Sequence, residues 1–272
     1  MKPPIGRDTQ LCMSLSARPG NFGSRFHNHL YEALGLDYVY KAFSTRDLAA
    51  AIGGIRALNI RGCAISMPFK EACIPLLDSL ATSADVLGSV NTIVNDAGHL
   101  RGYNTDYVAI VKLLERNGIS PQTSFVLRGS GGMAKAVASA LRDSGFGEGT
   151  IVARNEAAGR RLAMSCGYRW QAESGDLHAA MLVNVTPVGM AGGDESEDLA
   201  FDEAAIDAAD IAFDVVALPS ETPFVRAARS CGKRVITGAD VIVLQALEQF
   251  VLYTGVLPSA EQVRRAAEFA RG

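Results

Sequence analysis

The segment from Ser124 to Asn155 constrains the fold of this chain more than any other. An apolar run over residues 124–128 predicts a strand, and the glycine cluster Gly129-Ser130-Gly131-Gly132 follows it directly. The alanine-rich residues 133–141 predict a helix, and residues 150–153 predict a second strand. This order forms half of a mononucleotide-binding unit, in which glycine lets the backbone approach a pyrophosphate and the helix N-terminus offers unpaired N–H groups. The segment therefore predicts a nucleotide site, with a plain glycine turn as the alternative.

The residues at the end of the second predicted strand indicate which dinucleotide binds. An NAD site usually carries an Asp or Glu there, which holds the ribose 2′-hydroxyl. This chain has Ala153-Arg154-Asn155 instead. A guanidinium pairs with a 2′-phosphate through charge-assisted hydrogen bonds, whereas a carboxylate would repel that phosphate. We therefore predict NADP as the cofactor; the alternative is that Arg154 is a solvated residue at a strand end.

Composition excludes several classes of protein. The 272 residues are enough for one large or two ordinary domains, and a net charge of −3 gives no sign of binding to nucleic acid or to a membrane surface. The five cysteines are scattered and form no C-x-x-C pair, so we expect reduced thiols and no metal site. No signal-peptide or membrane-spanning apolar run is present, which favours a cytoplasmic location. The sequence leaves both a monomer and a homodimer open.

The rest of the chain alternates predicted strands and helices. The strands are expected at 10–15, 38–43, 60–66, 89–94, 99–103, 181–185, 211–217 and 233–236. The helices are expected at 22–34, 104–115, 155–166, 222–231, 239–254 and 259–271. A further helix is expected to begin after an N-cap at Ser44 or Thr45 and to end at residue 58. Such alternation predicts an α/β protein with mostly parallel sheets. The final two helices exceed a minimal nucleotide domain. We therefore predict an N-terminal α/β substrate domain, 1–104 with 239–272, and an inserted Rossmann-like dinucleotide-binding domain, 105–238.

Polar side chains interrupt the apolar pattern of the first predicted domain at four strand ends. They are Ser14 with Ser16, Ser66 with Lys70, Asn91, and the run Asn104-Thr105-Asp106. Asn91 lies in an apolar run, where a buried amide needs partners, and Lys70 lies in a first helical turn, where the helix dipole disfavours a cation. The serines as turn residues and Asp106 as a dipole-stabilising residue remain alternatives.

These motifs, in this order, resemble the shikimate dehydrogenase family over nearly the whole chain. The matching segments are Ser14-Leu15-Ser16, His27-Asn28, 62–70, Val90-Asn91-Thr92, 102–106, 129–132, 153–155 and Gln245-Ala246. The longer loop after Ser16 and the Ser66-Met67-Pro68-Phe69-Lys70 variant resemble its divergent shikimate dehydrogenase-like branch. The resemblance implies an NADP-dependent oxidoreductase that interconverts 3-dehydroshikimate and shikimate in chorismate and aromatic amino acid biosynthesis.

The resemblance also implies roles for individual residues. Lys70 and Asp106 would form the catalytic acid–base pair. The substrate would bind to Ser14, Ser16, Ser66, Asn91 and Gln245. The cofactor would contact Gly129, Ser130, Gly131, Gly132, Met133, Ala134, Ala153, Arg154, Asn155, Thr186, Val215 and Gly238.

The chain departs from the family pattern at positions that bear on the substrate. Ala64 replaces an Asn, Ser66 a Thr, Ala217 a Tyr and Tyr107 a Gly. Loss of an amide and a phenol removes two hydrogen bonds, each contributing roughly 0.5–1.5 kcal/mol. We therefore expect weaker turnover of shikimate, or a related substrate such as quinate or another hydroxy acid.

Two other functions compete with this reading. One is a different enzyme on the same plan, acting on a folate one-carbon unit or an aminoacyl-tRNA, which would not explain the serines, Lys70 and Asp106 together. The other is a nucleotide-binding sensor that has lost turnover, which would not need a general acid.

Overall fold

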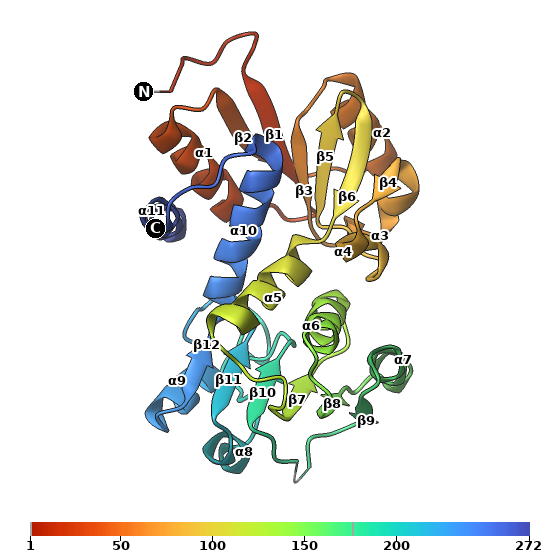
Figure 1. Ribbon diagram of the computed structural model, residues 1–272, viewed down its shortest axis with the longest axis vertical. Coiled ribbons are helices and arrows are strands. Elements are labelled where there is room, and N and C mark those ends of the chain that lie inside the picture. The colour runs from red at the N-terminus through yellow and green to blue at the C-terminus, as the bar shows by residue number, and fades with distance from the viewer. Residues whose placement is uncertain (1, 176) are drawn as a thin grey trace. The chain divides into compact units, whose positions relative to one another are not determined.

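The computed structural model describes residues 2–175 and 177–272. They form two compact units, residues 2–105 with 243–272 and the described residues between 106 and 242 (Figure 1). The predicted boundaries at 104/105 and 238/239 therefore differ by one residue and by four residues from those observed. The second boundary falls inside α10 (Gly238–Thr254), so the first turn of this helix belongs to the second unit.

The first unit contains a mixed six-stranded sheet of order β2-β1-β3-β5-β6-β4. Its strands are β1 (Gln10–Leu15), β2 (Tyr38–Phe43), β3 (Gly62–Ile65), β4 (Ser79–Leu80), β5 (Thr92–Asp96) and β6 (His99–Tyr103). Strands β1, β2 and β3 are mutually parallel, whereas β5 runs antiparallel to β3 and forms the predicted hairpin with β6. The hairpin turn consists of Ala97 and Gly98, both at positive φ, as a tight two-residue turn requires.

Five helices and a short 3₁₀ turn accompany this sheet. They are α1 (Phe22–Leu34), α2 (Leu48–Ala57), α3 (Phe69–Ala72), η1 (Ile74–Leu76), α4 (Thr82–Asp85) and α11 (Ala260–Arg271), to which the C-terminal part of α10 is added. The predicted N-cap of α2 was wrong: Asp47 accepts from Ala50 N, while the Thr45 hydroxyl accepts from Asp47 N. Thr45 thus builds the turn that precedes the cap.

Strand alternation gives the first sheet two different faces. Met13, Leu15, Cys63 and Ile65 join Ile52 and Ile55 of α2 in one apolar core. The alternate residues, among them Gly62, face α10, since a Cβ at Gly62 would lie 2.2 Å from the Tyr253 ring. Ser14 and Ala64 share that face with Gly62. The Ser14 hydroxyl therefore lies on the side of the sheet that α10 covers.

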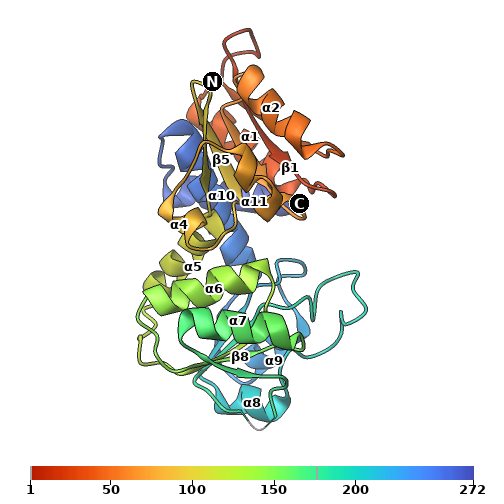
Figure 2. The same cartoon turned by 90° about the vertical axis from the view of Figure 1, so that its right-hand side faces the viewer.

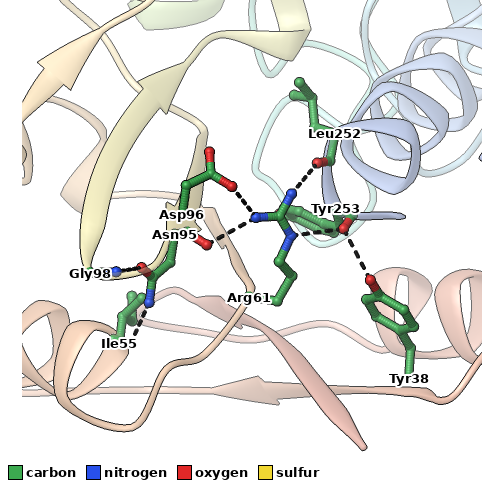
Figure 3. A network of polar contacts seen from close by, with 8 residues as sticks. All are labelled: Tyr38, Ile55, Arg61, Asn95, Asp96, Gly98, Leu252 and Tyr253. Carbon is green, nitrogen blue, oxygen red and sulfur yellow. Dashed lines mark hydrogen bonds and ion pairs between the residues drawn. The ribbon is translucent and has the colours of Figure 1, made fainter. Parts of the chain in front are cut away.

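Arg61 fixes the end of α10 against the first unit's sheet (Figure 3). Its guanidinium donates to the carbonyl oxygens of Tyr253 (2.9 Å), Leu252 (3.3 Å) and Asn95 (2.9 Å), and it pairs with Asp96. The last carbonyls of a helix have no partner within the helix, so a cation there supplies what the backbone lacks. This contact holds α10 in register with β3 and β5.

His27 of α1 is fully buried among aromatic rings. It stacks on Tyr40 at a centroid distance of 4.4 Å and lies 6.1 Å from Phe250. Neither ring nitrogen has a hydrogen-bond partner among the described residues. Burial lowers the pKa of His27 to about 3, because the imidazolium would lose its hydration, and the Gln249 side chain offsets only part of this shift.

We expect His27 to make the protein acid-sensitive. Between pH 6.5 and about 3 the unfolded chain binds a proton that the folded one excludes, so stability falls as pH falls through this window. The free energy of unfolding should decrease by about 2 kcal/mol more between pH 7 and pH 5 in the wild type than in His27→Phe. Urea unfolding at both pH values measures this difference. Parallel decreases in the two proteins would contradict the prediction.

The second unit contains an all-parallel six-stranded sheet of order β12-β11-β10-β7-β8-β9. Its strands are β7 (Phe125–Arg128), β8 (Gly149–Val152), β9 (Arg169–Gln171), β10 (Met181–Asn184), β11 (Ile211–Asp214) and β12 (Arg234–Ile236). In chain order this is the 3-2-1-4-5-6 arrangement of a Rossmann sheet. The sequence missed β9, a three-residue edge strand in which polar residues flank Trp170. The order of strands reverses between β7 and β10, which places a crevice beyond their carboxyl ends.

Helices cover both faces of the second sheet. Its helices are α5 (Thr105–Arg116, from its second residue), α6 (Gly132–Asp143), α7 (Glu156–Cys166), α8 (Glu203–Ala208) and α9 (Pro223–Ser230). Helices α6 and α7 lie side by side on one face, and α8 and α9 on the other (Figures 1 and 2). The predicted starts at Asn155 and Thr222 are confirmed as N-caps, each accepting from a backbone N–H three residues on.

Candidate functional site

The glycine turn predicted from the sequence links β7 to α6. Gly129 has φ +132° and its N–H donates to Val152 O, so the turn closes against β8. A Cβ at Gly129 would lie 2.8 Å from Val185 O, which leaves room only for glycine. Gly131 is the N-cap of α6 and, having no side chain, leaves the first backbone N–H groups of the helix uncapped. The first N–H groups of a 12-residue helix therefore point to where a phosphate can bind.

A cavity of about 770 Å³ opens beside this turn, within the second unit. Its walls come from the carboxyl ends of β7, β8 and β10 and from the loops that follow them. They include Arg128, Gly129, Ser130, Gly131, Ala153, Arg154, Asn155, Val185, Thr186 and Phe201. Concave sites at the switch point of a parallel sheet commonly hold dinucleotides.

The structure brings most of the predicted cofactor residues together at this cavity. Gly129, Ser130, Gly131, Ala153, Arg154, Asn155 and Thr186 line it, whereas Gly132, Met133, Ala134, Val215 and Gly238 do not. Gly132 and Met133 begin α6, and Ala134 is fully buried behind the turn. Gly238 lies at the start of α10, where a Cβ would approach Val216 O to 2.2 Å.

A buried polar network supports the cavity from below. The Asp214 carboxylate accepts from Thr222 Oγ1 (2.6 Å), Val216 N (3.0 Å) and Asn184 Nδ2 (3.0 Å). Asn184 Oδ1 accepts in turn from Thr186 Oγ1 (2.6 Å). Burial raises the pKa of Asp214, and these donors partly offset that effect. The network ties the loop after β10 to β11 and so fixes the position of Thr186 in the cavity wall.

Arg128 is a residue of the cavity that the sequence analysis missed. It ends β7 after three buried residues, and its Nη1 donates to Ala200 O. Burial lowers the pKa of Arg128, and Arg154 lowers it further while Glu195 opposes the shift. The available signal was an arginine ending an otherwise apolar strand, one residue before the glycine turn.

In the first unit, the predicted serines lie at one end of the sheet. Ser14 and Ser16 belong to the carboxyl end of β1, and Ser66 follows β3, where its N–H donates to Leu15 O. Ser14 is paired in register with Ala64, and Ala64 with Thr92. Ser16 is buried, Ser14 half-buried and Ser66 exposed. Because β5 is antiparallel to β3, Asn91, just before β5, belongs to the same end of the sheet.

Asn91 is fully buried, and its side-chain oxygen is hydrogen-bonded whereas its side-chain nitrogen is not. Its Oδ1 accepts from Thr105 N (2.7 Å) and Thr92 Oγ1 (2.9 Å), so it caps the start of α5. Its Nδ2 has no partner among the described residues. A buried amide donor without a protein partner is costly unless an ordered water or a ligand accepts from it. Asn91 therefore combines a structural contact with a free donor.

The two residues with predicted catalytic roles lie at helix starts. Lys70 is half-buried in α3, and its carbonyl oxygen accepts from Val90 N (2.8 Å), which fixes α3 beside the segment that carries Asn91. Asp106 is the second residue of α5 and is buried. It follows Thr105, whose N–H is held by Asn91.

Gln249 of α10 is a second polar residue that the sequence analysis missed. Its Nε2 donates to Thr92 Oγ1 (3.0 Å) and lies 3.4 Å from Asn91 O, so it reaches the residues that hold the start of α5. Gln245, with a predicted substrate role, lies one turn earlier on the same face of α10 and is half-buried. The spacing of four residues between two glutamines in an apolar helix was the available signal.

Of the departures from the family pattern, Tyr107 makes a polar side-chain contact, whereas Ala64 and Ala217 have no polar side-chain atom. Tyr107, in place of a Gly, donates through its hydroxyl to Asp143 Oδ2 of α6 (2.9 Å). Burial raises the pKa of Tyr107 to about 12, and Asp143 adds to the shift. Ala64 is half-buried between Ser14 and Thr92 and offers no polar group. Ala217 follows β11 and is half-buried.

Two negative findings hold for residues 2–175 and 177–272. They contain no group of three or more His, Cys, Asp or Glu side chains placed to hold a metal ion. None of their helices is both long and apolar enough to cross a membrane.

Comparison with known proteins places the chain in a family. Residues 22–93 match the model of the shikimate dehydrogenase substrate binding domain. A shikimate dehydrogenase-like protein of Haemophilus influenzae is 57% identical over 98% of both chains. The shikimate 5-dehydrogenase of Thermus thermophilus, solved with NADP(H) and shikimate, is 29% identical with a TM-score of 0.86, covering 96% of this chain and 99% of that one. The quinate dehydrogenase of Corynebacterium glutamicum, solved with NAD, is 29% identical with a TM-score of 0.87, covering 96% and 98%. The two-domain α/β fold and the resemblance inferred from the motifs are thereby confirmed, and the chain belongs to the shikimate dehydrogenase family.

Proposed function

We propose that this protein is an NADP(H)-dependent oxidoreductase that interconverts 3-dehydroshikimate and shikimate, or a close cyclic hydroxy acid. The observation that carries the proposal is the presence of both halves of such a site in a member of this family. One is a dinucleotide cavity with Arg154 in its wall, and the other is a set of hydroxyls, an amide and a lysine at one end of the first sheet. A nucleotide-binding sensor would need only the first.

The cavity of the second unit has features that suit both the pyrophosphate and the 2′-phosphate of NADP(H). A Cβ at Gly131 or Gly132 would have no atom within 4 Å, so the start of α6 is open to a pyrophosphate. Arg154, at the end of β8, supplies a charge for the 2′-phosphate. When bound, NADPH supplies the hydride, whereas the residues described here orient it and exclude water.

The chain's own residues then handle the proton. In the reductive direction, the Lys70 ammonium polarises the substrate carbonyl and donates a proton to the oxygen as the alcohol forms. The Asp106 carboxylate orients the lysine and stabilises its charge. Asn91 Nδ2, the buried donor without a partner, is offered to a substrate hydroxyl or carboxylate. In the oxidative direction, neutral Lys70 accepts the proton.

The substrate pocket of this chain makes fewer polar contacts than the family pattern provides. Ala64 lacks the amide and Ala217 the phenol of that pattern. Two lost hydrogen bonds of roughly 0.5–1.5 kcal/mol each correspond to a loss of about 5-fold to 150-fold in kcat/KM. We therefore propose weak turnover of shikimate, or a preference for a related hydroxy acid.

Steady-state assays of NADPH oxidation and NADP⁺ reduction test the function. The substrates are 3-dehydroshikimate, shikimate, quinate and simpler hydroxy acids, and the reference is a family member that carries the Asn and the Tyr. We expect turnover of at least one cyclic acid and a shikimate kcat/KM about 5-fold to 150-fold below the reference. Equal kcat/KM values would refute the weakened pocket. NADPH binding without turnover of any of these acids would favour a sensor.

A further inference from the structure

Arg128 occupies an unusual position for a charged residue. It ends β7 directly after Phe125, Val126 and Leu127, each of which is at most 2% exposed. Its side chain is half-buried, lines the cavity beside Gly129 and uses Nη1 on the Ala200 carbonyl. Among the residues that the structure describes, only one of its five N–H donors is hydrogen-bonded, and a half-buried guanidinium is stabilised by an anion.

Arg128 and Arg154 line the same cavity from neighbouring strands. Residue 128 is paired in register with residue 152 of β8, two residues before Arg154. Proximity to Arg154 contributes to the lowered pKa of Arg128. The two guanidiniums repel one another, and a negative group beside them reduces this repulsion. Together they contribute two positive charges to the wall of one cavity.

Two carboxylates, Glu195 and Asp198, act electrostatically on Arg128. Glu195 contributes the larger effect and also contacts Arg154. Its Oε1 lies 3.5 Å from Arg154 Nη1, and it opposes the downward shift in the pKa of Arg128. The loop that carries it is held by backbone bonds: Gly189 N donates to Glu195 O (2.8 Å), and Asp198 N donates to the same oxygen (3.3 Å). Glu195 is therefore held beside the arginines by the fold.

We propose that Arg128 and Arg154 together form the 2′-phosphate site, and that Glu195 is an internal counter-ion which the 2′-phosphate displaces. This inference deepens the proposed function, because it rests on NADP binding in this cavity. A 2′-phosphate carries nearly two negative charges at pH 7, which balance the two positive charges of the guanidiniums. The single negative charge of Glu195 balances only one of them. NADH carries a 2′-hydroxyl in its place and has no charge to exchange with Glu195.

The test is calorimetric titration of the full-length protein with NADPH and with NADH. Arg128→Leu, which suits the apolar strand, should weaken NADPH binding about 10-fold and change NADH binding less than 2-fold. Glu195→Gln should tighten NADPH binding about 3-fold to 10-fold and leave NADH within 2-fold. A merely structural role for Arg128 would weaken both nucleotides equally.

Two matched variants control for charge and loop chemistry. Glu197→Gln removes the same charge from the same loop, but Glu197 lies 3.8 Å from Arg226 and is largely exposed. Arg226→Leu removes a guanidinium outside the cavity wall. Both should keep the NADPH/NADH affinity ratio within 2-fold of the wild type, because exposed charges are screened at physiological salt.

The outcomes separate this inference from the proposed function. Failure of the wild type to bind either nucleotide would overturn both. Wild-type preference for NADPH with unchanged ratios in Arg128→Leu and Glu195→Gln would overturn the inference alone. If Arg128→Leu does not fold, Glu195→Gln decides, because its side chain is 35% exposed and its removal spares the core. An unchanged NADPH affinity in that variant would exclude the counter-ion.

Discussion

Replacing Lys70 with methionine is expected to lower kcat for 3-dehydroshikimate reduction by about 10³-fold, within the 10²-fold to 10⁴-fold range of general acid catalysis. Methionine keeps the length and apolar stem of the side chain but cannot donate a proton or polarise the carbonyl. NADPH affinity should stay unchanged, since Lys70 belongs to the first unit and the dinucleotide cavity to the second. Stopped assays at high enzyme concentration, with a parallel NADPH titration, measure both quantities.

Lys41→Met is the matched control for this variant. Lys41 lies exposed on β2, with its ammonium 4.2 Å from the Phe43 ring centroid, and carries no proposed role. Its kcat should stay within 2-fold of the wild type. A Lys70→Met enzyme that retains a third or more of the wild-type kcat would show that another group donates the proton.

Replacing Asn91 with leucine is expected to lower both stability and turnover. Leucine has a similar volume but leaves the Thr105 N–H without its acceptor at the start of α5. A buried backbone donor left unpaired costs about 1–3 kcal/mol, so the free energy of unfolding should fall by about 2 kcal/mol. The freed Thr92 hydroxyl retains Gln249 as a neighbour at 3.0 Å, which limits the loss. Urea unfolding followed by far-UV circular dichroism gives the difference.

Turnover distinguishes the two roles of Asn91. If its free Nδ2 binds substrate, Asn91→Leu should raise KM for the hydroxy acid about 10-fold, beyond any loss of folded protein. Asn21→Leu is the control, because Asn21 precedes α1, is exposed and makes no side-chain cap. Its stability and KM should match the wild type. A wild-type KM in Asn91→Leu would show that Asn91 only stabilises the start of α5 and does not bind the substrate.

Local signals in the sequence were sufficient for most secondary structure. The helix that ends at Gly35, the hairpin closed by Ala97-Gly98 and the starts at Asn155 and Thr222 all depend on residues close in the chain. The N-cap of α2 was misassigned because Thr45 and Asp47 both suit that position, and only the geometry of the turn chooses between them. Strand β9 was missed because three residues are too few to show a period.

The segment from Ser124 to Asn155 determined by itself that the chain has a dinucleotide-type turn, since the spacing of glycines, strand and helix is local and only glycine fits at Gly129. Only the tertiary structure determined which side chains from distant parts of the sequence come together in the two units. It brought Arg128 and Arg154 to one cavity with Glu195 beside Arg154, joined Gln249 of α10 to Thr92, and left Asn91 Nδ2 without a partner among the described residues. These contacts link residues far apart in sequence, up to 157 positions for Gln249 and Thr92, and they depend on strand order and on helices packed across a sheet. No local pattern encodes such distances, because they arise only when the whole core has been buried.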